Sequence, residues 1–109
     1  MLIKIQEIIG EYCSQRIDSP QKKGGQAIRE MVLENWDKGD IEVSFEGVKL
    51  VTPSFLDEAF GKLVLEHNLK EMINKLKFTH IGEETKEKIN RSVELRIKQK
   101  RDNFNPLDS

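Results

Sequence analysis

The stretch IEVSFEGVKLVTPSFLDEAFGKL, residues 41–63, decides the fold class of this chain. It opens with strict alternation, because Ile41, Val43 and Phe45 are apolar and the residues between them are polar. This period of two predicts a half-buried β-strand. Gly47 then breaks the pattern. The short apolar segment 48–51 that follows either continues the strand past a bulge or forms an irregular link.

A helix start comes directly after this link. Thr52 suits the N-cap position, and Pro53 suits the first helical position, where a missing backbone N–H costs nothing. Asp57 and Glu58 place negative charge in or just after the first turn, which is favourable to the helix dipole. Ser54 and Asp57 also have the spacing of a shifted capping box. The segment therefore predicts a strand, a turn and a capped helix in immediate succession.

The patterns on either side of this segment also alternate between strands and helices. The predicted elements are a strand at 2–5, a loop at 18–25, a helix at 28–36 ended by Gly39, the strand at 41–45, a helix from 53 with a break at 67–68, a strand at 77–81 and a helix at 83–101. This order favours a parallel or mixed sheet with helices packed on it. We predict a single α/β domain over 1–109 with a mixed β-sheet: an N-terminal strand and loop at 1–24, a core at 25–101 and a frayed tail at 102–109.

Length and composition exclude several classes of protein. The 109 residues (12.6 kDa) suffice for one hydrophobic core. Cys13 is the single cysteine, which excludes a disulfide framework. Lys4 and Glu7 interrupt the apolar N-terminus, and no segment has the roughly 20 apolar residues of a membrane span, so we expect a cytoplasmic protein without membrane binding. We also expect no metal and no cofactor.

The net charge of −1 conceals an uneven distribution. Residues 30–66 carry nine acidic and three basic side chains, whereas residues 86–101 carry seven basic and two acidic ones. A solvated helix face is the simplest interpretation of the basic segment. The alternative is a nucleic-acid-binding helix with Lys98, Lys100 and Arg101 as its basic patch, although aromatic residues for base stacking are almost missing near it.

The segment SFLDE at 54–58, preceded by VSFEGV at 43–48, carries a resemblance to a known family. It resembles the STAS-like families, the relatives of anti-sigma factor antagonists and of the cytosolic domains of sulfate transporters. It is most similar to small bacterial STAS-like domains of unknown function. The resemblance extends loosely over 25–109 and is specific in the central segment.

In the antagonists a D-S-x-G motif starts the helix, and a kinase-like ATPase partner phosphorylates its serine. Ser54 is the matching position by strand–turn–helix context. This chain departs from the motif, because Thr52 and Pro53 replace the Asp-Ser pair and Phe55 replaces the glycine. The resemblance implies regulation by partner switching. The residues by themselves favour a simpler interpretation, with Ser54 as a capping residue and Phe55 as a core anchor.

These observations predict a non-enzymatic regulatory module that binds a protein. The resemblance implies a histidine-kinase-like ATPase or another signalling protein as the partner. The predicted contact surface combines the helix start with its flanking turn and a polar rim: Gly47, Thr52, Pro53, Ser54 and Phe55, with Asp57 and Glu58 at the rim. Catalysis by the two carboxylates is disfavoured, because neighbouring residues on a helix point about 100° apart.

Two further alternatives stay open. A small enzyme would need a pocket that holds His80, Glu83 or Cys13. A homo-oligomer would follow if Phe55 or Trp36 were exposed, because exposed apolar patches on small domains are often buried between copies.

Overall fold

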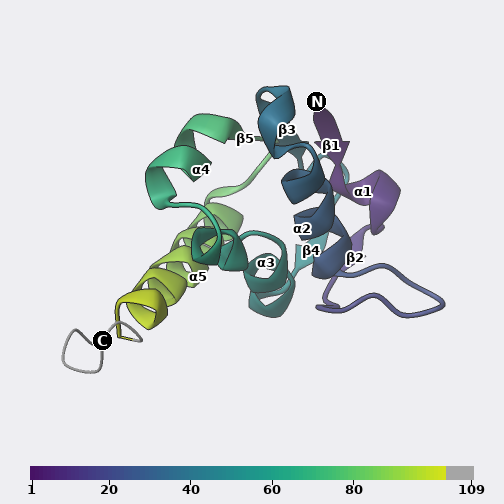
Figure 1. Cartoon of the computed structure of the whole chain (residues 1–109). Helices are drawn as coiled ribbons and strands as arrows, with labels where there is room; N and C mark the ends of the chain where they lie inside the picture. Colours follow the sequence, from purple (N-terminus) through teal and green to yellow (C-terminus); the bar gives the residue numbers. More distant parts are fainter. Residues whose placement is uncertain (103–109) are drawn as a thin grey trace.

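Strands and helices alternate along the chain in the computed structural model, which describes residues 1–102 (Figure 1). The elements are β1 (Leu2–Lys4), α1 (Ile5–Ile8), β2 (Tyr12–Cys13), α2 (Gly25–Glu34), the 3-10 helix η1 (Trp36–Lys38), β3 (Ile41–Ser44), β4 (Leu50–Val51), α3 (Pro53–Ala59), the 3-10 helix η2 (Gly61–Leu65), α4 (Leu69–Lys75), β5 (Leu76–Thr79) and α5 (Glu83–Asp102). Of the predicted frayed tail, Asp102 is the last residue of α5, and 103–109 lie outside the described residues.

The main sheet has three parallel strands in the order β1-β3-β5. Val43 at its centre lies beside Ile3 on one side and Phe78 on the other, so the N-terminal strand belongs to this sheet. The predicted α/β class is confirmed. The element order allowed a parallel or a mixed sheet, and we predicted a mixed one; every strand pair within residues 1–102 is parallel.

The segment 48–51 does not extend β3. A tight turn follows β3, in which the Val48 N–H donates to the Phe45 carbonyl (3.0 Å) and Gly47 adopts a φ of +82°. The chain then forms β4, which pairs with β2 in a separate two-stranded sheet. The turn needs Gly47 because most side chains disfavour a positive φ. This pairing was hidden from the sequence because each of its strands has only two residues.

The helix α3 lies between α2 and α5, as Figure 1 shows. Its apolar side chains Phe55 and Leu56 are fully buried, together with Phe60 just after it and Ile28 of α2. The Phe60 ring meets the edge of the Phe78 ring with centroids 5.1 Å apart, which joins α3 to the main sheet. The helix that carries Ser54 therefore packs against α2 and α5, and Phe60 at its end packs against the main sheet.

The N-terminus of α3 forms as predicted, whereas the capping box does not. Thr52 is the N-cap, and its Oγ1 accepts a hydrogen bond from the Phe55 N–H at 3.2 Å. Pro53 is the first helical residue. The Asp57 carboxylate faces α5 instead of turning back to Ser54, because stronger donors on α5 bind it. The predicted break at 67–68 is confirmed, and Asn68 caps α4.

Close contact between α2 and α3 depends on Gly25. A Cβ atom at this position would lie 2.6 Å from the Phe55 carbonyl oxygen and 2.9 Å from the Glu58 Cβ. Neither neighbour can move without displacing α3, because one is backbone and the other is the stem of a buried side chain. Gly25 therefore sets the distance between the two helices.

We expect Gly25→Ala to lower the free energy of unfolding by about 1–2 kcal/mol through overpacking. Gly82→Ala is the matched control, since a Cβ there would meet nothing within 4 Å. Urea unfolding of both variants measures the difference. Equal stability of the two variants would show that the α2–α3 contact adapts freely and that Gly25 does not set the spacing.

The last helix, α5, has 20 residues, the length of a membrane span, but charged side chains occur throughout it. Along residues 1–102, no helix combines the length and the apolar character needed to cross a membrane.

Candidate functional site

Ser54 is exposed in the first turn of α3 and lines a groove between α3 and α5. The groove has a volume of about 350 Å³, and we call it the α3–α5 groove. One wall is Pro53, Ser54 and Asp57, and Arg16 from the loop before α2 joins it. The other wall is one face of α5: Lys88, Arg91, Ser92, Leu95, Arg96 and Gln99. They form two rows with a spacing of four, 88-92-96 and 91-95-99, which lie side by side on one face of the helix.

Asp57 fastens this groove together. Its Oδ1 accepts hydrogen bonds from Ser92 Oγ and Arg96 Nε, both at 2.8 Å, and its Oδ2 accepts one from Arg16 Nη1 at 2.7 Å. Burial opposes ionisation of this carboxyl, but the hydrogen bonds from Arg96, Arg16 and Ser92 outweigh it and hold its pKa well below its usual range. Asp57 is thus a fixed anion that joins α3, α5 and the loop before α2.

Glu58 forms ion pairs on the side of α3 that faces α2. Its side chain is only 1% exposed and pairs with Arg29 of α2 and with Lys62, whose Nζ lies 2.9 Å from Oε1. Arg29 also donates to the Glu58 carbonyl oxygen at 2.8 Å. Burial by itself would raise the pKa of Glu58, but the hydrogen bonds and charges of Arg29 and Lys62 lower it. Glu58 therefore links α2 to α3 inside the fold.

These contacts correct the predicted contact surface. Glu58 is not at a polar rim, because it is buried in ion pairs. Asp57 is 13% exposed and already accepts hydrogen bonds from four donor groups on three residues. Phe55 is fully buried, so it is a core anchor and contributes no surface. Gly47 lies in the turn after β3 and does not line the α3–α5 groove.

Three predicted contact residues do lie together at the start of α3. Pro53 and Ser54 are exposed, and Thr52 is half-buried between its capping bond and the Ser14 carbonyl at 3.4 Å. The surface part of the predicted site is thus smaller than the sequence indicated and continues into the α3–α5 groove instead of toward Gly47.

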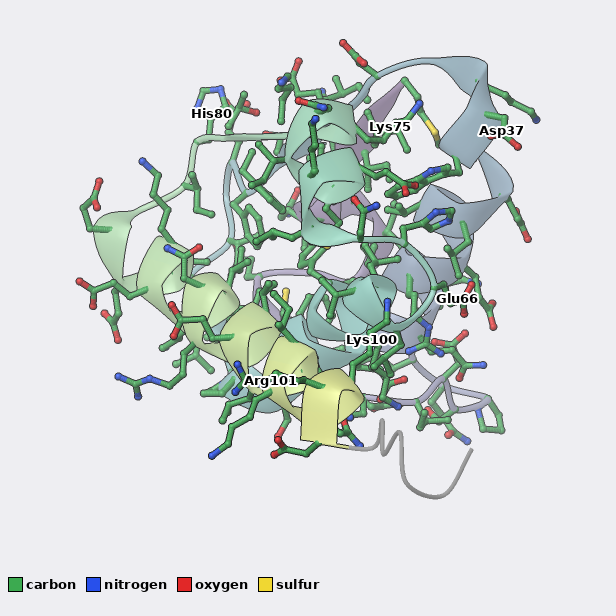
Figure 2. The ribbon with its side chains drawn as sticks, turned by 60° about the vertical axis from the view of Figure 1, so that its left-hand side comes forward. Asp37, Glu66, Lys75, His80, Lys100 and Arg101 are labelled. Atoms are coloured by element: carbon green, nitrogen blue, oxygen red, sulfur yellow. The ribbon has the colours of Figure 1, made fainter. Side chains whose placement is uncertain are left out.

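The predicted basic patch is divided, because Lys98 and Arg101 are three positions apart and lie on one side of α5, whereas Lys100 does not. Lys98 and Lys100 are two positions apart, which turns them to different sides of a helix. Lys100 Nζ donates to the Val64 carbonyl at 3.1 Å and so caps η2. Figure 2 shows Lys100 and Arg101 at the C-terminal end of α5, while His80 lies near its start. The helix face beside Ser54 instead carries Lys88, Arg91 and Arg96.

The positive charge of this face could have been found in the sequence from spacing alone. Helical spacing places five polar or charged residues and one leucine on a single stripe, at positions 88, 91, 92, 95, 96 and 99. The total charge of 86–101 obscured it, because the total does not separate the sides of the helix. Arg16 carried no comparable signal, since it comes from a loop distant in sequence.

The residues proposed for a small enzyme do not share a pocket. Cys13 is buried, and burial raises the pKa of its thiol to about 11, against a smaller lowering by Lys22. His80 is exposed, with Nε2 3.8 Å from a Glu46 carboxylate oxygen. The groove that His80 lines includes neither Cys13 nor Glu83. Of these three groups, only His80 lines that groove.

The structure does not meet the condition on which a homo-oligomer was expected, which was exposure of Phe55 or Trp36. Trp36 is buried and stacks on His67 with ring centroids 3.9 Å apart, and Phe55 is fully buried. Neither can form the patch on which a homo-oligomer was predicted. Exposed apolar side chains occur elsewhere, among them Leu69 and Ile73 of α4 and Leu95 of α5.

Comparison with known proteins places the chain in a family. The model of the family described as a STAS-like domain of unknown function (DUF4325) matches residues 24–86. The chain belongs to this family. No curated protein and no solved structure matches the chain significantly.

The match divides the candidate site. It includes the part of the STAS-like domain from α2 to the start of α5, with Ser54, Asp57 and Glu58. Arg16 precedes the matched residues, and Lys88, Arg91 and Arg96 follow them. The α3 residues that line the groove thus lie within the family match, whereas the four cations that line the groove lie outside the match.

Proposed function

We propose that this STAS-like domain is a non-enzymatic regulatory module that binds a protein partner at the start of α3. The observation that supports it is an exposed Ser54 on a helix that is fixed from both sides by buried or half-buried ion pairs of Asp57 and Glu58. A rigid helix end with an accessible hydroxyl can be recognised without first being ordered, which lowers the cost of binding. The resemblance to anti-sigma factor antagonists suggests a histidine-kinase-like ATPase as the partner.

The charged groups of the site support a binding role better than a catalytic one. Both carboxylates of α3 are held as anions by several donors, so neither has the pKa of a general acid or base near neutral pH. A phosphate on Ser54 would add about two negative charges to a groove lined by Lys88 and Arg91. Such a change would alter the charge of the surface that a partner contacts. Partner switching requires a change of this kind.

The test is capture of a partner followed by binding to defined variants. Tagged domain is incubated with a native bacterial lysate, and the captured protein is purified and titrated against wild type by calorimetry. We expect a kinase-like ATPase or another signalling protein. We expect Ser54→Trp to weaken its binding at least about tenfold, because an indole at the helix start blocks close contact. Glu87→Trp, at an exposed position of α5, adds the same bulk elsewhere and should leave binding unchanged.

Two results would contradict the proposal. One is recovery of no protein under gentle conditions. The other is equal affinity of the captured partner for wild type and Ser54→Trp, which would place the contact surface away from α3.

A further inference from the structure

The α3–α5 groove has an excess of positive charge that its own residues do not neutralise. Among the described residues, four cations line it, namely Arg16, Lys88, Arg91 and Arg96, and Asp57 is the one carboxylate. Asp57 pairs with Arg16 and Arg96 and accepts a hydrogen bond from Ser92, and Arg16 also lies 3.5 Å from a Glu58 carboxylate oxygen. Arg16 and Arg96 are therefore paired, so the unneutralised charge of the groove is that of Lys88 and Arg91. The groove therefore presents net positive charge to anything that enters it.

Arg91 is the most available of these cations. It is exposed, and within residues 1–102 its guanidinium takes part in no hydrogen bond or ion pair. Lys88 is partly engaged, since its Nζ donates to the Val51 carbonyl at 3.1 Å and lies 3.4 Å from a Glu84 carboxylate oxygen. An arginine without a partner beside a groove is suited to bidentate binding of a carboxylate.

An apolar contact lies next to this charge. Leu95 is 61% exposed, one helical turn after Arg91 on the same face of α5. Pro53, also exposed, lines the groove from the side of α3. An aliphatic side chain placed between Leu95 and Pro53 would remove apolar surface from water while carboxylates beside it meet Arg91 and Lys88. The groove thus combines two different kinds of recognition within one small volume.

We infer that the α3–α5 groove binds an acidic peptide segment of the partner that carries an apolar side chain among its carboxylates. This inference rests on the proposed function and names the chemistry of the contact. A peptide fits better than a nucleic acid. The groove is small, at about 350 Å³, and within residues 1–102 its lining contains no aromatic side chain for base stacking. Leu95 also lies among its cations. A phosphate backbone would gain nothing from Leu95.

Synthetic peptides test this without knowledge of the partner. The probe is a short fluorescein-labelled peptide with acidic residues on both sides of a leucine. One control peptide replaces the acids with lysines, and a second replaces the leucine with serine. Fluorescence anisotropy gives the affinities, and amide chemical shifts of isotope-labelled domain locate the contact. We expect binding of the acidic leucine peptide, weakened by salt, with shifts at Ser54, Arg91 and Leu95.

Variants of α5 then distinguish binding in the groove from nonspecific attraction between the acidic peptide and the basic helix. Arg91→Gln should weaken binding about tenfold, which corresponds to about 1.4 kcal/mol. Leu95→Ser should weaken it about fivefold and remove the preference for leucine over serine in the peptide. Lys98→Gln is the matched control, because Lys98 is an exposed cation of the same helix outside the groove. It should change affinity less than twofold.

Three results would overturn the inference: no shift of groove amides by the acidic leucine peptide at low salt, equal weakening by Arg91→Gln and Lys98→Gln, or tighter binding of single-stranded oligothymidylate at the same amides. These outcomes are distinguishable from failure of the proposed function. A captured partner that loses affinity with Ser54→Trp but not with Arg91→Gln would uphold the proposed function and reject the groove.

Discussion

Glu58→Gln is expected to lower the free energy of unfolding by about 3 kcal/mol, a large fraction of the ~5–15 kcal/mol typical of a domain. The substitution keeps the shape of the side chain and removes its charge. Arg29 and Lys62 then stay in a poorly hydrated position without the anion that both of them contact. We place the cost at the lower end of the range for broken buried ion pairs, because the Lys62 side chain is one third exposed and can regain water.

Urea unfolding measured by circular dichroism gives this difference, with Glu87→Gln as the control. Glu87 is an exposed glutamate of α5, so the control removes the same charge from solvent and should cost less than about 0.5 kcal/mol. A loss for Glu58→Gln no larger than that of Glu87→Gln would contradict the structural role of the carboxylate. The double variant Glu58→Gln with Arg29→Gln should cost less than the sum of its single variants, since the two side chains form one interaction.

The sequence predicted correctly those strands and helices whose formation depends on residues close to one another in the chain. The alternation around Val43 and the capping residues Thr52 and Pro53 depend on neighbours in sequence, and the structure confirms the strand and the helix start. The pairing of β2 with β4 was not predictable from two-residue segments. The predicted helix after Pro53 also ends sooner than its apolar run, at Ala59, and continues as η2.

The sequence predicted where the candidate site lies, at the start of α3, but not which side chains form its surface. Ser54 is exposed at a helix start, as the sequence indicated. Asp57 and Glu58 were predicted at the polar rim of the contact surface, since Asp and Glu side chains are mostly exposed. Their partners Arg16, Arg29 and Arg96 lie between 29 and 41 positions away in sequence, so only the tertiary fold reveals that the two carboxylates are bound.

The second large effect concerns Asp57, the carboxylate that joins the walls of the α3–α5 groove. Asp57→Asn is expected to lower the free energy of unfolding by about 2 kcal/mol at neutral pH, because Arg96 and Arg16 lose a shared anion. The amide still accepts one hydrogen bond, and Arg16 is well exposed, so the loss is smaller than for Glu58. Hydrogen exchange should also show faster opening of the loop 14–24 that carries Arg16.

The same carboxylate governs the response of the fold to acid. The pKa of Asp57 is lower in the folded chain than in the unfolded chain, where a carboxyl titrates near pH 4, so the unfolded state takes up the proton first. Its stabilising contribution is therefore complete above about pH 5 and decreases as the pH falls toward the folded pKa. Glu58 has the same direction of shift and adds to the decrease.

Asp57→Asn removes one of the two groups, so the stability of this variant should fall less steeply with acid. Between about pH 4 and pH 3 the slope should be smaller than that of wild type by up to about 1.4 kcal/mol per pH unit, the value for one proton. Urea unfolding at a series of pH values measures both slopes. Parallel slopes for wild type and Asp57→Asn would mean that Asp57 titrates alike in the folded and unfolded chains. Its contacts with Arg16, Ser92 and Arg96 would then not hold it as an anion, and the groove would lack the fixed wall that the further inference requires.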